Sequence, residues 1–474
     1  MSSKAAQRSR LIVSEPVRPL LLRLTLSALI GNLAMHLMGI VDTFYISRLG
    51  TLELAAASFV IPVHMIYVSL ALGIGMGMSS LNSRLIGESR FAESSRLISD
   101  GLMFAALFAV TVAMIGSVII DPLFRLLGAD DRTLPFIRDY LNILLLGLPP
   151  LMLVVIGNST FRSMGNIRMS ATLAGCLSVL NITLDPLLIF GIGPFPAMGI
   201  RGAAVATLLA ASITLIISFM VLGFYEKLLD FSRPRWLHLR KNWLQILGIG
   251  VPAMGANIMT PLAAAIMTAM VARFGDFVVA GFGVGSRVET ISLIFVMALS
   301  STLPMFIGQN IGAGRQDRAY SALMGCLKFV LIFQCLIYVL LLVMGDTIAG
   351  TFSSNPEVIN VITTYLMILP LTYGAHGVVV LIMVSLNVLR RPRTALLLTF
   401  TRLMLLYIPL AYFGSQLWGL KGLFAGAALG NMLAGGLAWF LIRKVCQELH
   451  LGPVSSVHEK HNSEKSAQSG GSLS

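Results

Sequence analysis

Charged residues are scarce in this chain of 474 residues. Asp, Glu, Lys and Arg together make up 12% of the sequence, and hydrophobic residues make up 56%. A soluble protein carries about 25% charged residues. This composition therefore excludes an ordinary soluble enzyme, a disordered protein and a nucleic-acid-binding module. It leaves a membrane protein that crosses the bilayer several times with helices.

The sequence also lacks the motifs of common catalytic and metal sites. Its four cysteines, Cys176, Cys326, Cys335 and Cys446, have no metal-ligand spacing. It contains no HExxH zinc motif, Walker A loop or nucleophile elbow. We therefore expect a protein that is not an enzyme and that uses no cofactor.

Long stretches without a charged residue predict the membrane spans. Residues 54–83, 243–272, 290–314 and 358–389 contain no Asp, Glu, Lys or Arg. A spanning helix needs about 20 mostly apolar residues, so each stretch is long enough. The apolar pattern of the whole chain predicts twelve spanning helices, near residues 19–46, 52–82, 97–120, 134–160, 168–191, 199–224, 243–272, 277–306, 320–344, 358–387, 394–414 and 419–442.

The distribution of Lys and Arg predicts the orientation in the membrane. Of the 34 basic residues, 26 lie in the two tails, in alternate loops or at the adjoining helix ends, 7 lie on the opposite side, and Arg287 lies within a span. Cytoplasmic loops carry the excess of Lys and Arg in membrane proteins. Both termini are therefore predicted to be cytoplasmic, in a plasma membrane. The net charge of +13 then reflects these loops rather than a nucleic-acid partner.

An internal repeat divides the chain into two halves of six spans each. A shift of 225 residues places Asn32 on Asn257 and Tyr140 on Tyr365. Because six is an even number, the two halves have the same orientation. The predicted fold is an all-α polytopic membrane protein of two six-helix bundles, related by a pseudo-two-fold axis along the membrane normal.

This repeat sets the expected domain organisation. The expected segments are a cytoplasmic N-terminal tail (1–18), an N-terminal lobe (19–224), a cytoplasmic loop between the lobes (225–242), a C-terminal lobe (243–444) and a disordered cytoplasmic C-terminal tail (445–474).

Four polar residues of the N-terminal half form the predicted ion-coupling site. An Asp at the centre of a spanning helix costs about 2.5–3.5 kcal/mol, so its presence suggests a function. Asn181 and Asp185 are four residues apart and share a helix face. At 1.5 Å per residue, Asp42, Asp185 and Thr207 lie roughly 6, 9 and 12 Å from the outer ends of their helices. Two alternatives stay open: Asp42 is an interfacial residue, or Asp185 is a structural carboxyl bonded to Asn181.

Five further polar residues are expected to line a substrate cavity. Arg287 and Glu289 lie near the middle of a span but only two residues apart, so they do not face each other. The other three candidates are Asn32, Asn257 and His376. A single histidine in a span also serves as hydrogen-bonded packing, so this role stays open for His376.

Four segments give the chain its family resemblance. They are Val41-Asp42-Thr43, residues 161–166 (FRSMGN), residues 181–186 (NITLDP) and residues 199–207 (GIRGAAVAT). In their order and span placement they resemble the multidrug and toxic compound extrusion (MATE) family, and the resemblance covers about residues 17–445.

The resemblance implies a V-shaped pair of six-helix bundles. It also implies export of bulky, often cationic organic compounds in exchange for H⁺ or Na⁺. In prokaryotic members of the DinF-like type, the positions that match Asp42, Asn181, Asp185 and Thr207 form a site in the N-terminal lobe. The NorM-like type has a Glu in the seventh span and an Asp in the tenth. Here the seventh span has no acid and His376 takes the tenth-span position, so the chain is closer to the DinF-like type.

These observations predict a mechanism and leave alternatives. Two neighbouring carboxylates favour a bound proton, and an ionised site attracts a cationic compound, so the two ligands compete for one charge. A site of carboxylates, Asn181 and Thr207 accepts either H⁺ or Na⁺. We expect a monomer in the lipid bilayer. The alternatives are a lipid-linked-precursor flippase of the same superfamily, a major facilitator carrier, whose loop signature is absent, and an integral-membrane enzyme.

Overall fold

The computed structural model describes residues 3–126, 130, 132–230 and 236–451, and within these residues every regular element is helical. The elements are α1 (Ser3–Ser14), α2 (Val17–Ser47), α3 (Thr51–Gly87), α4 (Phe91–Leu126), α5 (Leu134–Ser163), α6 (Ile167–Phe190), α7 (Ile200–Met220), η1 (Val221–Tyr225), α8 (Trp236–Ala272), α9 (Asp276–Ser292), α10 (Ile294–Gly312), α11 (Gln316–Phe352), α12 (Pro356–Ile368), η2 (Leu369–Thr372), α13 (Tyr373–Val388), α14 (Pro392–Phe400), η3 (Thr401–Tyr407) and α15 (Ile408–Glu448).

The number of spans agrees with the sequence prediction. In the described part of the chain, eleven helices are long and apolar enough to cross a membrane, and the last of them is 57 residues long. Its backbone breaks at Trp418 and at Gly419, where φ is +59°, a left-handed conformation that glycine adopts without a steric penalty. The break separates two segments that match the predicted spans 394–414 and 419–442. The all-helical polytopic fold is therefore confirmed.

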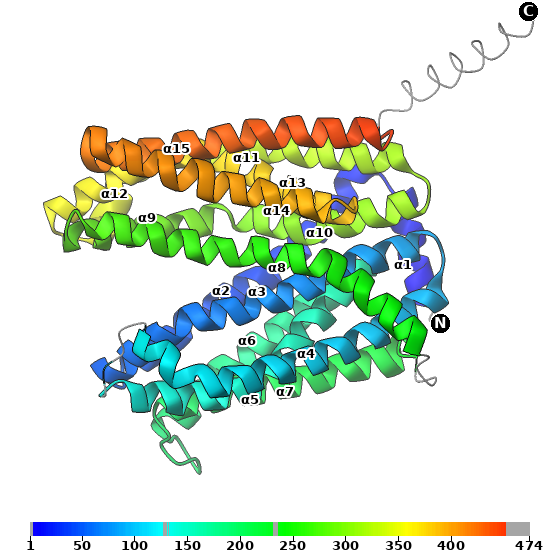
Figure 1. Cartoon of the computed structure of the whole chain (residues 1–474), viewed down its shortest axis with the longest axis horizontal. Helices are drawn as coiled ribbons and strands as arrows, with labels where there is room; N and C mark the ends of the chain where they lie inside the picture. The colour runs from blue at the N-terminus through cyan, green and yellow to red at the C-terminus, as the bar shows by residue number, and fades with distance from the viewer. Residues whose placement is uncertain (1–2, 127–129, 131, 231–235, 452–474) are drawn as a thin grey trace, which may run out of the picture. The chain divides into compact units, whose positions relative to one another are not determined.

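Two predicted spans are interrupted rather than continuous. The predicted span 277–306 consists of α9 and α10, which meet at a single turn residue, Leu293. The predicted span 358–387 consists of α12 and α13, joined by the 3₁₀ segment η2, which contains Pro370. A proline lacks the backbone donor that a regular α-helix needs, which explains the second interruption. Figure 1 shows these helices in order along the chain.

The chain packs as two units, each with its own interior. Unit 1 contains residues 3–10 and 23–265, and unit 2 contains residues 11–22 and 266–451. In unit 1, helix α5 lies at the centre and contacts α3, α4 and α7, while α6 packs on α7. In unit 2, helix α13 has the central place and contacts α10, α11, α14 and α15. The lobe boundaries at 224 and 243 stay predictions.

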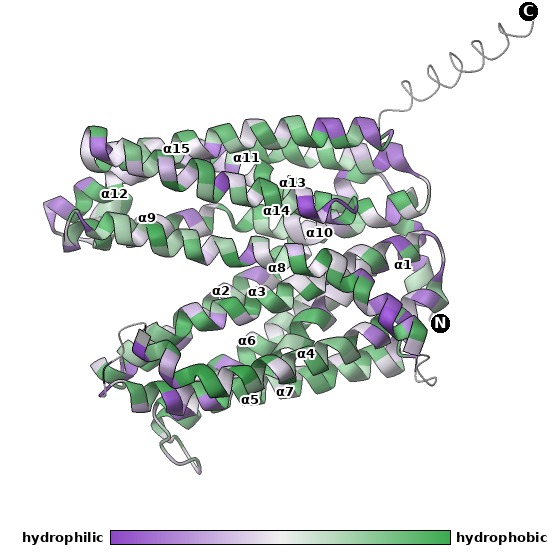
Figure 2. Ribbon diagram, viewed as in Figure 1, coloured by the Kyte–Doolittle hydropathy of each residue, from purple (hydrophilic) through white to green (hydrophobic). Residues whose placement is uncertain are grey.

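The helices are apolar along their length and polar near their ends, as Figure 2 shows by colour. Helix α2 is loosely packed: Leu22, Ile30 and Ile40 expose 52%, 68% and 68% of their surfaces. Large apolar side chains face outward in a membrane protein because lipid, not water, surrounds them.

The glycine-rich segment of α3 is a packing surface. A Cβ on Gly77 would lie 2.5 Å from the carbonyl oxygen of Ile246, and a Cβ on Gly73 would lie 2.9 Å from that of Gly250. The glycines therefore let α3 and α8 approach closely, as small residues do between membrane helices.

The predicted tails have helical parts. The predicted N-terminal tail contains α1, and Arg8 of this helix pairs with the fully buried Glu226 at 2.6 Å. Helix α15 continues to Glu448, beyond the predicted start of the C-terminal tail at residue 445. Residues 452–474 of that tail, and residues 231–235 of the predicted inter-lobe loop, lie outside the described part of the chain.

Candidate functional site

The predicted ion-coupling residues meet inside unit 1. Asn166 accepts a hydrogen bond from the backbone of Met169 at 3.2 Å and so caps the start of α6. Further along this helix, Asn181 and Asp185 are both fully buried. The amide of Asn181 donates to Asp185 Oδ1 at 3.5 Å and to Thr207 Oγ1 on α7 at 3.2 Å. The i, i+4 spacing and the packing of α6 on α7 create this cluster.

The cluster has more acceptors than donors. Within the described residues, Asp185 Oδ2, Asn181 Oδ1 and Asp42 Oδ1 are buried and have no hydrogen-bond partner. Asp185 also makes no ion pair there. A buried polar atom without a partner costs free energy, so oxygens of this kind mark a site for a proton or a small cation. No group of three His, Cys, Asp or Glu side chains in the described chain is arranged to hold a metal ion.

Asp42 lies on α2, half-buried, within electrostatic range of Asp185. Tyr140 on α5, which is 8% exposed, is within electrostatic range of both carboxyl groups. The sequence prediction did not include Tyr140 in the site. The internal repeat could have identified Tyr140 as a candidate, because the shift of 225 residues places it on Tyr365 of the second half.

A small cavity adjoins Thr207. It is enclosed, has a volume of about 10 Å³, and is lined by His64 and Tyr67 of α3 and by apolar side chains of α5. This volume is close to the minimum that holds one water molecule. The cavity therefore extends the polar interior of unit 1 from α7 to α3.

A second polar cluster lies inside unit 2. The hydroxyl of Tyr365 donates to Glu289 Oε2 at 2.5 Å, and His376 Nδ1 lies 3.5 Å from Glu289 Oε1. Gly285 makes room for the tyrosine, because a Cβ there would lie 2.5 Å from Cγ of the Tyr365 ring. The structure thus brings together Glu289 of α9, Tyr365 of α12 and His376 of α13.

A cation completes the cluster of unit 2. Arg402, in the π-helical segment η3, is within electrostatic range of Glu289. Its Nε donates to Asn431 at 3.2 Å, and the amide of Asn431 lies 3.4 Å from Thr372 Oγ1. A π-helical turn inside an α-helix often marks a functional site. This cluster carries one fixed positive charge, whereas the cluster of unit 1 carries none.

The cluster of unit 2 lies at the position that the small cavity of unit 1 has in the repeat. The 225-residue shift carries His64 onto Glu289 and Leu151 onto His376. His64 and Leu151 both line the small cavity of unit 1. At this position the first half has a small cavity and the second half has a cluster of polar side chains, whereas Asp185 of unit 1 corresponds to Leu410.

The remaining predicted cavity residues make no hydrogen bond or ion pair with these clusters within the described chain. Arg287 is exposed on α9. Asn32 on α2 and Asn257 on α8 are half-buried, and within the described chain their side chains make no hydrogen bond. A substrate-cavity role for these three residues stays a prediction.

Known proteins resemble this chain over nearly its whole length. A family model described as MatE matches residues 28–187 and 252–413. The two matches begin 224 residues apart, in agreement with the 225-residue repeat. A relative from Shewanella oneidensis named FAD transporter is 39% identical over 436 residues, covering 92% of this chain and 96% of the relative. The multidrug export protein MepA of Staphylococcus haemolyticus is 22% identical over 440 residues, with the same shares covered.

A solved structure shows the same fold. The crystal structure of the Vibrio cholerae MATE transporter VcmN in its bent form has a TM-score of 0.86 and is 28% identical, covering 93% of this chain and 98% of that one. A likeness over this share of both chains shows that this chain has the fold of that transporter.

Proposed function

Because the chain belongs to the MATE family of multidrug and toxic compound extrusion transporters, we propose that it exports small organic compounds in exchange for a cation bound at Asp185. Members of this family are transporters and not enzymes. The chain is a multi-pass integral membrane protein. The coupling ion, the compound and the plasma-membrane location belong to this proposal.

The main support for the proposal is the carboxyl group of Asp185, which has no cationic side chain beside it within the described residues. It is fully buried, one of its oxygens has no partner, and Asn181 and Thr207 supply further oxygens beside it. Keeping an ionised carboxylate in such a place is costly unless a cation joins it. A proton fits because it binds a carboxylate oxygen, and Na⁺ fits because it binds carboxylate, hydroxyl and amide oxygens.

Competition at this site produces exchange. An empty, ionised site attracts a cationic compound, and a proton or Na⁺ that binds there removes the charge that holds the compound. Two ligands that each weaken the binding of the other are thermodynamically coupled, and the coupling is reciprocal. A change of the site's access from one side of the membrane to the other turns this competition into antiport.

The experiment follows transport in proteoliposomes. A fluorescent lipophilic cation is loaded, and its efflux is measured under a pH gradient alone and under a Na⁺ gradient alone. Asp185→Asn should abolish the gradient-driven part. Asp139→Asn, which removes an exposed carboxylate that pairs with Arg201, is the matched control and should transport normally.

Each outcome has a meaning. Transport by Asp185→Asn at the wild-type rate would refute the proposed coupling site. Loss under only one gradient would identify H⁺ or Na⁺ as the coupling ion. Absence of any gradient-driven transport by the wild type, combined with scrambling of a lipid-linked precursor, would favour the flippase.

A second candidate compound is a flavin dinucleotide. The relative named FAD transporter is 39% identical to this chain over 92% of its length. A dinucleotide of this kind carries a diphosphate, and guanidinium groups bind phosphate oxygens through charge-assisted hydrogen bonds. Arg402 in unit 2 supplies such a group within electrostatic range of His376 and Glu289.

One further variant distinguishes between the two candidate compounds. Arg402→Gln should reduce FAD efflux and leave efflux of the lipophilic cation near the wild-type rate, whereas Asp185→Asn should abolish both. If Arg402→Gln lowers both equally, the residue is structural. Failure of the wild type to move FAD would leave the organic cation as the compound.

A further inference from the structure

The beginning of helix α8 has two faces with different surroundings. The first face has the i, i+3, i+4, i+7 spacing of a helix and consists of Leu239, Asn242, Trp243 and Ile246. Leu239 and Ile246 are 4% and 0% exposed. The amide of Asn242 donates to Asp100 Oδ2 on α4 at 2.8 Å, and the indole of Trp243 donates to the backbone carbonyl of Asp100 at 2.9 Å. This face therefore packs against the rest of unit 1.

The second face lies on the opposite side of the helix and is exposed. It has the same spacing and consists of Leu237, Arg240, Lys241 and Leu244. Leu237 and Leu244 expose 76% and 57% of their surfaces. With His238 and Gln245, these four residues line an open pocket of about 590 Å³. The pocket shares no residue with the two polar clusters described above, so its role is separate from theirs.

The two cations of the second face are unpaired. Arg240 and Lys241 make no hydrogen bond or ion pair within the described part of the chain, and none of the described residues that line the pocket is acidic. Asp100, which the first face contacts, already pairs with Arg96 at 3.2 Å. In the sequence, residues 231–235 before α8 contain two arginines and no acid. The second face therefore has a surplus of positive charge.

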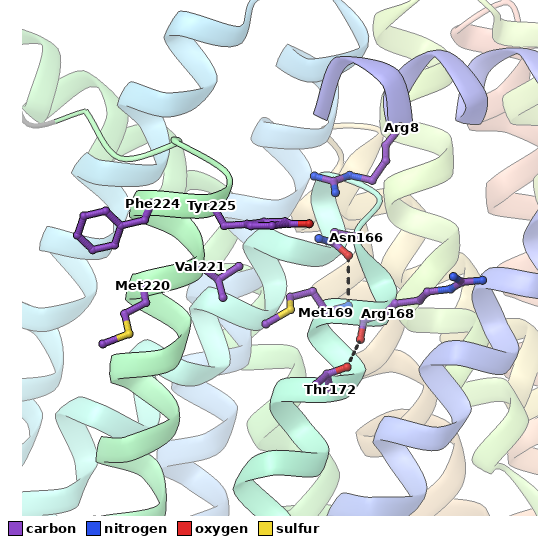
Figure 3. Close-up of a pocket in the computed structure, with 9 residues that line it drawn as sticks. All are labelled: Arg8, Asn166, Arg168, Met169, Thr172, Met220, Val221, Phe224 and Tyr225. Carbon is purple, nitrogen blue, oxygen red and sulfur yellow. Dashed lines mark hydrogen bonds between the residues drawn. The ribbon is translucent and has the colours of Figure 1, made fainter. Parts of the chain in front are cut away.

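A cation of helix α1 in unit 1 is balanced instead. Figure 3 shows Arg8 of α1 above Asn166, which lies at the beginning of α6, in a pocket of about 690 Å³. Both side chains donate to Glu226, which is fully buried, Arg8 at 2.6 Å and the Asn166 amide at 3.0 Å. Because this carboxylate offsets the charge of Arg8, the ion pair leaves no positive charge for an anionic ligand. Arg240 and Lys241 have no such carboxylate among the described residues.

The length of α8 puts the second face at the level of the lipid headgroups. The helix has 37 residues, so it is roughly 55 Å long at 1.5 Å per residue, whereas the hydrocarbon core of a bilayer is about 30 Å thick. Lys241 is the last charged residue before the charge-free stretch 243–272. The first turns of α8 therefore lie outside the hydrocarbon core. Trp236, which is 70% exposed, begins the helix, and tryptophan is enriched at this level of the bilayer.

We propose that the second face of α8 binds an anionic phospholipid, whose phosphate lies at Arg240 and Lys241 and whose acyl chain lies along Leu244. Charge complementarity supports this occupant, because basic surfaces beside membrane helices bind anionic headgroups. Val251, two helical turns beyond Leu244 and 55% exposed, continues the apolar surface toward the hydrocarbon core. A soluble phosphate compound would use the two cations only and leave the apolar surface without a role. The lipid would hold the beginning of α8 at the membrane surface.

The charge of the second face sets the size of the expected effect. One Lys or Arg near an anionic membrane surface strengthens binding roughly five-fold. Arg240→Gln should therefore weaken the binding of phosphatidylglycerol about five-fold, and Arg240→Gln combined with Lys241→Gln should weaken it more than about ten-fold. Lys241→Arg keeps the charge and should bind like the wild type. Both side chains are exposed, so these variants should fold normally.

The experiment measures lipid binding to the full chain. The protein is purified in detergent, and retention of phosphatidylglycerol and of phosphatidylcholine with identical acyl chains is compared by native mass spectrometry. Arg393→Gln is the matched control, since Arg393 is exposed in unit 2 and makes no ion pair within the described residues. Leu244→Ser tests the apolar part of the face, and inorganic phosphate is added as a competitor.

The proposal expects preferential retention of phosphatidylglycerol by the wild type, by Lys241→Arg and by Arg393→Gln, with weaker retention by Arg240→Gln and Leu244→Ser. Equal retention of the two lipids by the wild type would overturn it, as would equal retention of phosphatidylglycerol by Arg240→Gln and Arg393→Gln. Displacement of the lipid by millimolar phosphate, with no effect of Leu244→Ser, would assign the face to a free phosphate compound instead. None of these readouts depends on transport, so a failure here leaves the proposed function untouched.

Discussion

At the scale of single residues, environment decides what an acidic group does. Asp121 pairs with Arg138, and Asp139 pairs with Arg201, on exposed surface. Surface pairs of this kind contribute about 0–1 kcal/mol. Asp185, by contrast, has Asn181 beside it and no cation within the described chain. The same residue type is therefore a surface partner in two places and a candidate ion site in the third.

The hydroxyl of Tyr365 gives a test of the cluster in unit 2. Tyr365→Phe removes the donor to Glu289 and should lower the stability of the protein by about 1.5–3 kcal/mol, because hydrogen bonds to charged groups are strong. Tyr338→Phe is the control, since the Tyr338 hydroxyl is exposed and lies 3.3 Å from the carbonyl of Met367. Thermal unfolding in detergent measures both. Equal shifts in unfolding temperature for the two variants would show that the Tyr365–Glu289 hydrogen bond contributes no more to stability than the exposed hydrogen bond of Tyr338.

The acidic residue after α3 gives a pH test outside the membrane. Partial burial opposes ionisation of Glu88, but hydrogen bonds from Arg90 and Arg84 outweigh it, so the pKa of Glu88 lies below its usual value. A group whose pKa is lowered by folding stabilises the protein above its ordinary pKa, here 4.5, and loses this effect as pH falls through the lowered value.

Glu88→Gln should therefore lower the unfolding temperature slightly at pH 7, by an amount equivalent to about 1 kcal/mol or less, and the difference should vanish in acid. Glu53→Gln is the control, since Glu53 makes no ion pair within the described residues. A difference between Glu88→Gln and wild type that persists unchanged at about pH 3 would contradict this account.

At the scale of elements, interruptions of regular helices accompany the sites. The turn at Leu293 follows Glu289 by one helical turn, and its backbone donates to the carbonyl of Glu289 at 2.9 Å. The 3₁₀ segment η2 lies between Tyr365 and His376, and η3 holds Arg402. Tertiary packing fixes such departures, because local sequence favours a continuous helix in each case except at Pro370.

Substitution of a glycine in α3 tests how closely α3 and α8 pack. Gly77→Ala places a Cβ against the carbonyl of Ile246 and should destabilise the protein by about 1–3 kcal/mol through overpacking. Gly248→Ala on α8 is the control, because a Cβ there meets nothing within 4 Å. It should be neutral or stabilising by up to about 1 kcal/mol, since alanine favours the helix. The unfolding temperature of Gly77→Ala should therefore lie clearly below that of wild type, and that of Gly248→Ala should equal or exceed it.

At the scale of the whole molecule, duplication followed by divergence explains the two polar interiors. The family model matches the chain twice, and Tyr140 and Tyr365 are equivalent in the two halves. Around them, unit 1 has Asp42 and Asp185, and unit 2 has Glu289, His376 and Arg402. One repeat therefore supplies two sites with different charge.

The predicted orientation belongs to this scale and has its own test. In a background without the four native cysteines, Arg132→Cys should react with a membrane-impermeant maleimide in intact cells. Lys241→Cys should react only after the membrane is opened. Both side chains are exposed, so access rather than burial decides the result. The reverse pattern would place both termini outside, against the bias of Lys and Arg.

The sequence by itself determined the spans, the repeat and most of the first cluster. Apolar runs of more than about 20 residues have few alternatives to a spanning helix. The i, i+4 spacing of Asn181 and Asp185 follows from helix geometry alone. Only the tertiary structure decided which helices meet. It brought Tyr140 to Asp185 and joined Glu289, Tyr365 and His376 from three helices, because the rotation and packing of each helix depend on its neighbours and not on its own pattern.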